Sequence, residues 1–222
     1  MADRAVIFDM DGVLVDSYQA HFESWARLGR EHGLTMTAEQ FSATFGRTSR
    51  DIIRNLWGDC VAEKDIPAWD ARKEAFYREI IRRDFPAMDG ASELISSLVE
   101  AGFLLAIGSS GPPENVAVVL HALGGEKHFS ASVDASDVTL GKPDPQVFLI
   151  AADKLGIAPS HCAVIEDAPA GVQAARRAGM AAVAITGTAG RDTLAEHAHV
   201  VVDSLQELSP ESIAQLIDSL AV

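Results

Sequence analysis

Three carboxylates follow one short apolar segment near the start of the chain. Asp9, Asp11 and Asp16 lie within eight positions, directly after the apolar residues 5–8. An apolar run without polar alternation is typical of a strand in a parallel sheet, because helices cover both of its faces. Ligands of open α/β sheets bind at the carboxyl ends of the strands. We therefore expect these carboxylates at a ligand-binding edge of a sheet.

The spacing of Asp9 and Asp11 favours chemistry over a simple turn. A lone Asp-Gly pair after a strand is more often a turn or a helix cap. Two acids two residues apart repel each other unless a cation lies between them, and a divalent metal is the obvious candidate. Asp9 is then a candidate nucleophile or metal ligand, and Asp11 a candidate general acid and base. We assign Asp16 a structural role.

A second acidic pair, Glu166-Asp167, ends another apolar segment in the sequence "CAVIEDAPAG". In one interpretation the two acids cap the helix that begins near Pro169. In the other, Asp167 meets Asp9 across neighbouring strand ends and holds Mg²⁺, a hard cation that prefers oxygen ligands. The residues alone leave both interpretations open.

Two further segments carry groups that suit a phosphoryl oxygen. Lys142 lies in the turn "GKPDP", and it is one of only five lysines in a chain of net charge −14. A solvated surface lysine is the simpler interpretation, but beside clustered acids Lys142 becomes the natural cation. Ser109 and Ser110 follow the apolar segment "FLLAIG". Hydroxyl and backbone N–H groups at such a turn bind phosphate well, although Ser-Gly turns are also common for steric reasons.

Composition limits the classes of partner and compartment. The 222 residues suffice for one domain with an insertion, and 48% hydrophobic with 23% charged residues is typical of a globular protein. The charge of −14 argues against nucleic acid and anionic membranes as partners. The two distant cysteines and the lack of a recognisable leader or membrane-spanning segment favour a reducing, cytoplasmic location.

The pattern of elements predicts an α/β domain with a helical insertion. From residue 87 onward, helical patterns alternate with short apolar segments, which indicates βαβ units and a parallel sheet. Residues 17–86 instead show helical periodicity without a convincing strand, and residues 37–40 form a capping box. We therefore expect an α/β domain formed by residues 1–16 and 87–222. The intervening residues 17–86 are expected to fold as an all-helical domain.

Four ordered segments together resemble one known family. The sequences "DMDGVLVDS", "IGSSG", "GKPDP" and "IEDAPAG" are similar to the ordered motifs of the haloacid dehalogenase (HAD) superfamily. The resemblance covers essentially the whole chain, including a helical cap between the first and second motifs. It implies a Rossmann-like parallel sheet with an inserted all-helical cap domain. "HFESW", "GKPDPQVF" and "EDAPAGVQAARRAGM" look most like the branch of β-phosphoglucomutases and small phosphatases.

The resemblance also implies a role for each motif residue. Asp9 is expected to attack phosphorus and form an aspartyl-phosphate, while Asp11 protonates the leaving oxygen and later activates the incoming water or hydroxyl. Ser109 and Lys142 are expected to hold the transferring phosphoryl group. The implied Mg²⁺ ligands are Asp9, the backbone carbonyl of Asp11, Asp167, and Glu166 at or next to the coordination shell.

Substrate-binding residues are expected from the cap and the second motif, namely His21, Gly46, Arg47, Arg50 and Ser110. A packing role for His21 beside Phe22 and Trp25 is equally compatible with the sequence. Arg47 and Arg50 lie in the loop "ATFGRTSRD" and either bind phosphate through the guanidinium fork or remain solvated.

Two catalytic outcomes share the first half-reaction. A phosphatase passes the phosphoryl group to water, whereas a sugar-phosphate mutase passes it to a second sugar hydroxyl. The mutases carry a lysine just before the cap-loop glycine, where this chain has Phe45, and polar, basic residues where it has Gly111-Pro112-Pro113. We therefore expect a phosphatase of a small phosphorylated metabolite, a sugar phosphate or a compound like phosphoglycolate, acting as a monomer or weak dimer. The alternatives are a β-phosphoglucomutase-type mutase and a catalytically silent HAD-fold binding protein.

Overall fold

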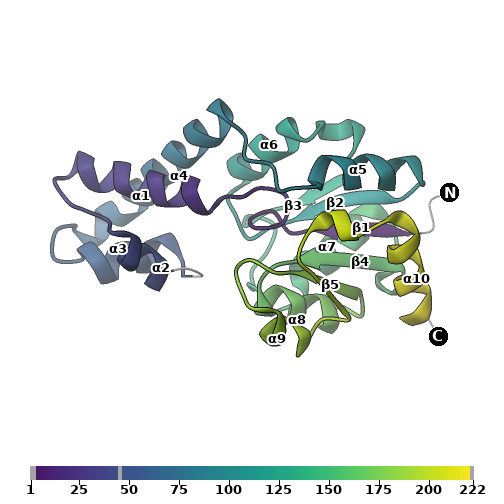
Figure 1. The fold of residues 1–222 in the computed structure, drawn as a ribbon. Coiled ribbons are helices and arrows are strands. Elements are labelled where there is room, and N and C mark those ends of the chain that lie inside the picture. Colours follow the sequence, from purple (N-terminus) through teal and green to yellow (C-terminus); the bar gives the residue numbers. More distant parts are fainter. Residues whose placement is uncertain (1–3, 45–46, 221–222) are drawn as a thin grey trace. The chain divides into compact units, whose positions relative to one another are not determined.

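The computed structural model describes residues 4–44 and 47–220, which form two compact units (Figure 1). One unit contains Met1–Asp16 and Pro86–Val222, and the other contains Ser17–Phe85. The second boundary lies one residue earlier than the sequence indicated. Pro86 belongs with the first unit because its carbonyl accepts a hydrogen bond from the Asp16 N–H (2.8 Å).

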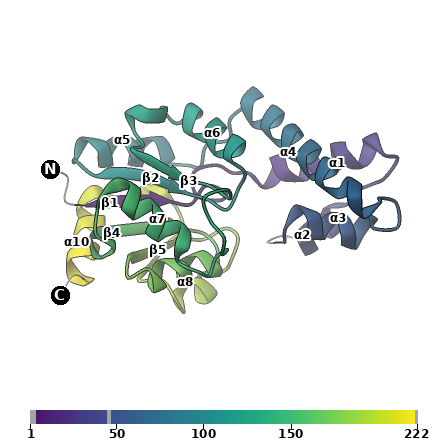
Figure 2. The same ribbon diagram turned by 180° about the vertical axis from the view of Figure 1, so that it is seen from behind.

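The first unit contains a six-stranded parallel sheet, which confirms the predicted α/β class. The strand order is β3-β2-β1-β4-β5-β6, so the first strand of the chain lies inside the sheet (Figure 2). The strands are β1 (Ala5–Phe8), β2 (Leu104–Gly108), β3 (Ala131–Val133), β4 (Cys162–Glu166), β5 (Ala181–Ile185) and β6 (Val200–Val202). The apolar segments near residues 5–8, 103–108 and 162–166 are all strands, whereas the sequence analysis did not single out β3.

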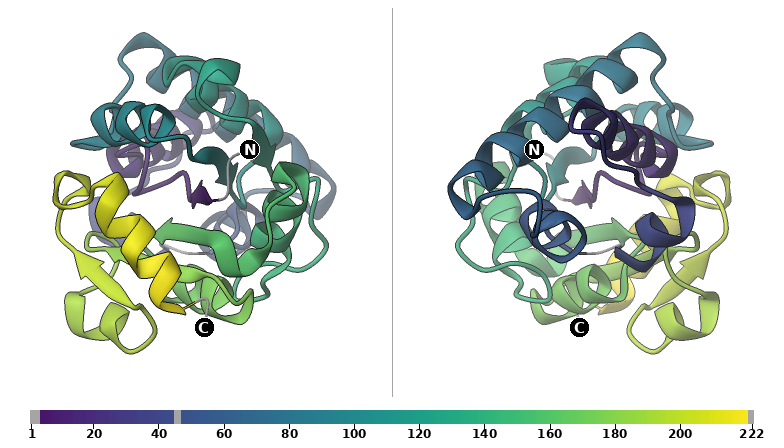
Figure 3. Two further views of the ribbon diagram at one scale, coloured as in Figure 1. Left: turned by 90° about the vertical axis from the view of Figure 1, so that its right-hand side faces the viewer. Right: turned by 90° about the vertical axis from the view of Figure 1, so that its left-hand side faces the viewer.

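Helices cover both faces of the sheet (Figure 3). They are α5 (Ala91–Glu100), α6 (Pro113–Ala122), α7 (Gln146–Leu155), α8 (Pro169–Arg177), α9 (Arg191–Ala195) and α10 (Pro210–Leu220), with short 3₁₀ turns at Gly125–Lys127, Pro159–His161 and Leu205–Glu207. Helices α7 and α8 pack against one face with Ala5 and Ile7, whereas α5 and α10 pack on the opposite face. Burial from both sides explains why β1 is apolar at every position.

The regular secondary structure in the described residues of the second unit is all helical. It contains α1 (Tyr18–Glu31), α2 (Ala38–Thr44), α3 (Ser49–Trp57), the 3₁₀ turn Glu63–Asp65, and α4 (Ile66–Arg83). The predicted capping box is present, because Thr37 Oγ1 accepts from the Gln40 N–H (3.1 Å) and Gln40 Oε1 accepts from the Thr37 N–H (2.9 Å). The core of this unit includes Trp25, Ile53 and Trp57. Among the described residues of both units, none of the helices has the length and apolar character needed to span a membrane.

Candidate active site

Neighbouring strands bring the two acidic motifs together. β1 and β4 pair in parallel with Phe8 opposite Ile165, so their carboxyl ends lie side by side. The Asp9 N–H extends this pairing by donating to the Ile165 carbonyl (2.9 Å). Asp9 and Glu166 therefore leave the sheet at the same level, at the carboxyl ends of neighbouring strands.

The carboxylates of Asp9, Glu166 and Asp167 form one buried cluster. One oxygen from each lies within 4.8 Å of the others, and the three residues are 8%, 2% and 4% exposed. Three acids at this distance repel each other strongly in a desolvated site. A cluster of carboxylate oxygens with this spacing and charge fits a hard divalent cation.

Two glycines allow the backbone to approach this cluster. A Cβ at Gly171 would lie 1.6 Å from Glu166 Oε1, and a Cβ at Gly12 would lie 2.1 Å from Asp167 Oδ2. Gly12 also has φ +78°, a conformation that other residues rarely adopt. The glycines after each motif are therefore required by the close packing of backbone around the carboxylates.

Lys142 supplies a positive charge inside the cluster. Its Nζ donates to Asp9 Oδ1, to Glu166 Oε1 (2.8 Å) and to the Gly108 carbonyl (3.3 Å). The second oxygen of Glu166, Oε2, accepts from the Ala168 N–H (2.7 Å). Both Glu166 oxygens thus have protein partners, so this side chain anchors the lysine as well as contributing to the acidic cluster.

Burial shifts the protonation equilibria of these groups. Desolvation raises the pKa of Asp9 well above its usual value, with Lys142 opposing the shift and the charges of Glu166 and Asp167 adding to it. Desolvation and the charge of Glu166 raise the pKa of Asp167 to about 7. Burial alone lowers the pKa of Lys142, but the charges of Asp9 and Glu166 outweigh burial and raise it. The site therefore has uncompensated negative charge that a bound cation would stabilise.

The other motif residues of the α/β unit lie at the same edge of the sheet. Ser109 directly follows β2 and is buried, and its Oγ accepts from the Gly111 N–H (2.9 Å). Ser110 is exposed, and Asp11 is half-buried in the turn after β1. The charge of Asp11 adds to the effects that raise the pKa of Asp167.

Thr188 contacts the acidic cluster and was not among the residues predicted from the sequence. Its hydroxyl donates to Asp167 Oδ2, and this bond lowers the pKa of Asp167 against the larger effect of burial. Thr188 follows β5, the strand next to β4. The rule that placed the acids at strand ends also applies to this strand, but "TGTAG" has the composition of an ordinary turn.

His21 in the helical unit belongs to a buried polar network. The Lys73 Nζ lies 2.7 Å from His21 Nδ1 and donates to Glu74 Oε1 (2.8 Å). The His21 ring stacks on Tyr77 with centroids 4.2 Å apart. An ammonium group only donates hydrogen bonds, so His21 accepts through Nδ1. The structure thus shows that His21 packs on Tyr77 and accepts a hydrogen bond from Lys73. The sequence was compatible both with packing and with substrate binding by His21.

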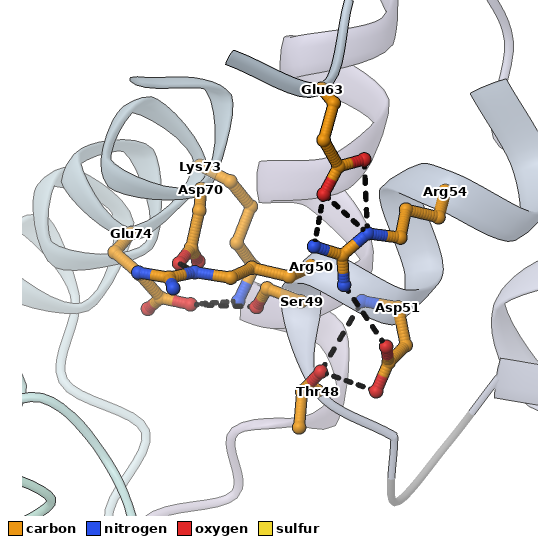
Figure 4. Close-up of polar contacts among 9 residues, drawn as sticks. All are labelled: Thr48, Ser49, Arg50, Asp51, Arg54, Glu63, Asp70, Lys73 and Glu74. Carbon is orange, nitrogen blue, oxygen red and sulfur yellow. Dashed lines mark hydrogen bonds and ion pairs between the residues drawn. The ribbon is translucent and has the colours of Figure 1, made fainter. Parts of the chain in front are cut away.

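The loop "ATFGRTSRD" places its two arginines in different surroundings. The Arg50 Nε donates to Asp70 Oδ2 (3.2 Å), and the nearby Ser49 Oγ contacts Glu74 (Figure 4). Arg47 is exposed, and no side chain among the described residues pairs with it. Gly46, the remaining predicted residue of this loop, lies outside the described residues.

Glu74→Gln should destabilise the helical unit much more than Glu79→Gln. The first change leaves the buried Lys73 without its carboxylate, which we expect to lower the free energy of unfolding by about 3 kcal/mol. Glu79 pairs with Arg27 at the surface, so its loss should cost at most about 1 kcal/mol. All three tryptophans lie within residues 17–85, and their fluorescence during urea unfolding reports on this unit. Equal changes in midpoint would contradict the prediction.

Comparisons with known proteins give consistent matches over this fold. A profile of the family described as haloacid dehalogenase-like hydrolase matches residues 4–179. Validoxylamine A 7'-phosphate phosphatase of Streptomyces hygroscopicus subsp. limoneus is 34% identical over 214 residues, covering 92% of this chain and 95% of that protein. Hexitol phosphatase A of Escherichia coli (strain K12) is 34% identical over 209 residues, covering 94% of each. The crystal structure of β-phosphoglucomutase from Clostridium difficile is similar with a TM-score of 0.81 at 25% identity, covering 98% of each chain.

Proposed function

Since the chain belongs to the haloacid dehalogenase-like hydrolase family, we propose that it is a Mg²⁺-dependent phosphatase of a small phosphorylated metabolite, acting through an aspartyl-phosphate on Asp9. The observation that carries this proposal is the buried cluster of Asp9, Glu166 and Asp167, with Lys142 bound to its first two members. Relatives whose names describe phosphatases of phosphorylated carbohydrates and polyols support a substrate of that class.

Asp9 is the group that attacks phosphorus. The attacking carboxylate oxygen forms a bond to phosphorus while the bond to the leaving oxygen breaks, and Asp11 gives that oxygen its proton. Asp11 then takes a proton from water, which attacks the aspartyl-phosphate, releases phosphate and restores the Asp9 carboxylate. Asp11 is thus the general acid in the first step and the general base in the second.

Lys142 and Ser109 stabilise the transferring group. The ammonium of Lys142 lies beside Asp9 Oδ1, where it can bind a phosphoryl oxygen as negative charge is redistributed in the transition state. The hydroxyl and backbone groups of residues 109–111 offer further donors at the end of β2. Asp9 and Asp167, with Glu166 beside them, are the side chains that would hold Mg²⁺. The bound ion would neutralise phosphoryl charge and align the phosphate with Asp9.

A β-phosphoglucomutase-type reaction is the second candidate, favoured by the similarity to the Clostridium difficile structure. The turn after Ser110 argues for hydrolysis. Gly111, Pro112 and Pro113 lead into α6, and none of them has a side-chain hydrogen-bond donor. A second phosphate on a bisphosphate substrate would therefore find no side-chain ligand in these three residues.

Two parallel assays of the purified chain test the proposal. Phosphate release is measured across phosphorylated sugars, polyols and phosphoglycolate. Conversion of β-glucose 1-phosphate to glucose 6-phosphate is measured with a bisphosphate primer. Stoichiometric phosphate release supports hydrolysis, whereas efficient isomerisation without net phosphate release makes the protein a mutase. No Mg²⁺-dependent release from any substrate, including p-nitrophenyl phosphate, would favour a silent binding protein.

Arg47→Ala should reduce selection among natural substrates. We propose that Arg47 binds the leaving group, because its guanidinium is exposed and Arg50 is already paired with Asp70. Loss of a hydrogen bond to a charged group predicts a fall of roughly 10-fold in kcat/KM for phosphorylated metabolites. Small artificial esters do not reach a remote binding group, so their kcat/KM should be unchanged. Arg54→Ala, which removes an arginine paired with Glu63, is the matched control. Equal losses on all substrates would exclude a role for Arg47 in selection.

A further inference from the structure

Lys142 lies in a segment that has no regular secondary structure. This segment begins after β3 at Val133 and ends where α7 begins at Gln146. The lysine nevertheless places Nζ within hydrogen-bonding distance of Asp9, Glu166 and the Gly108 carbonyl. Without a helix or strand to hold it, the backbone on both sides of Lys142 must be fixed by other contacts.

Gln146 fixes the backbone before Lys142. Its side-chain Oε1 accepts from the Thr139 N–H (2.8 Å) and from the Leu140 N–H (2.9 Å). One amide oxygen thus accepts from two consecutive backbone N–H groups, which in a strand would bind a neighbouring strand. The Gln146 N–H in turn donates to Asp144 Oδ1 (3.0 Å), which ties the first residue of α7 to the same segment.

Arg177 fixes the backbone after Lys142. Its Nη1 donates to the carbonyl of Pro143, the next residue after the lysine, at 2.9 Å. Arg177 lies in the last turn of α8, the helix that begins just after Glu166 and Asp167. Helix α8 therefore begins just after the acidic motif, and its last residue binds the segment that carries Lys142.

We propose that Gln146 and Arg177 are positioning residues that clamp the segment of Lys142 from its two sides and so set the place of Nζ beside Asp9. The inference rests on the phosphoryl-binding role proposed above for Lys142. Neither residue touches the reacting atoms, so each acts only through the lysine. Displacement of a catalytic group by 1 Å can cost up to roughly 100-fold in rate.

Arg177→Met and Gln146→Leu test the clamp, with Arg176→Met as the control. Arg176 occupies the same last turn of α8 and contributes the same charge to the helix end, but makes no such contact among the described residues. We expect each clamp variant to lower kcat on p-nitrophenyl phosphate by roughly 10-fold, with a smaller rise in KM. Arg176→Met should match the wild type. Arg177→Lys keeps a donor and should recover part of kcat.

A double-mutant cycle separates positioning from a general structural effect. If Arg177 acts through the lysine, Arg177→Met should cause no further loss of kcat in a Lys142→Met background. The same holds for Gln146→Leu. Additive losses, or a wild-type kcat in both single clamp variants, would overturn the clamp. Circular dichroism during thermal unfolding identifies any loss that follows simply from unfolding.

The Lys142→Met variant separates failure of the clamp from failure of the proposed role of Lys142. A large loss of kcat in Lys142→Met, together with unaffected clamp variants, would reject the clamp and leave the proposed function standing. A wild-type kcat in Lys142→Met would overturn the role of the lysine and the clamp with it.

Discussion

Asp9→Asn should lower turnover by at least roughly 10³-fold, because the amide has the shape of the carboxylate but cannot attack phosphorus. The fold should remain intact. Burial raises the pKa of Asp9, so the ionised side chain is less favourable in the folded protein than in water. Replacing it with a neutral group of equal size should leave the unfolding midpoint unchanged or higher.

Asp16→Asn is the matched control for this experiment. Asp16 lies in the same N-terminal segment, but its side chain is exposed and its backbone N–H is fixed by Pro86. Turnover of this variant should equal that of the wild type. Acid quenching during turnover of a labelled substrate should trap phosphate on the wild type and on Asp16→Asn, and not on Asp9→Asn. Retention of a tenth of wild-type turnover by purified Asp9→Asn would exclude Asp9 as the nucleophile.

The gathering of Asp9 and Asp167 was predictable because one physical rule governs it. Parallel strands end at the same edge of a sheet, so polar residues that follow separate apolar segments meet there. To apply this rule one has to know only that the strands exist, and apolar segments such as residues 162–165 indicate them. The rule needs no knowledge of strand order, although β1 and β4 are adjacent in the observed sheet.

Strand β3 was missed because its sequence carries little information. It has three residues, Ala131, Ser132 and Val133, of which only Val133 is buried. Such a segment is a strand because β2 offers it a parallel partner, with Gly108 opposite Val133. Pairing of this kind is a tertiary effect, and neither apolar periodicity nor β-propensity predicts it.

The Lys73 network was beyond sequence reasoning for a different reason. A lysine in a helical pattern is normally assigned to the solvent-facing side, because burying its charge is costly. Lys73 is nevertheless only 2% exposed, since Glu74 and His21 satisfy its ammonium group. His21 lies 52 positions away on another helix, so only the packing of α1 against α4 brings the two residues together.

Removal of divalent metal should abolish turnover completely, and Mg²⁺ should restore it. Asp9, Glu166 and Asp167 provide three buried carboxylates in contact distance of one cation, and the single ammonium of Lys142 cannot neutralise all of them. Dialysis against EDTA followed by titration with Mg²⁺ tests the requirement. Ca²⁺ should bind but inhibit, because it is larger and accepts more ligands in a less regular geometry.

Calorimetric titration of Mg²⁺ provides a readout that does not depend on catalysis. Asp167→Asn should weaken Mg²⁺ binding by at least roughly 10-fold, since it removes one charged ligand. Asp218→Asn is a suitable control, because Asp218 is an exposed carboxylate that pairs with Arg4, which precedes β1 at the end of the strand opposite to Asp9. Full turnover in excess EDTA would contradict a metal-dependent reaction. Unchanged Mg²⁺ affinity in Asp167→Asn, with turnover still metal-dependent, would instead place the ion on ligands other than Asp167.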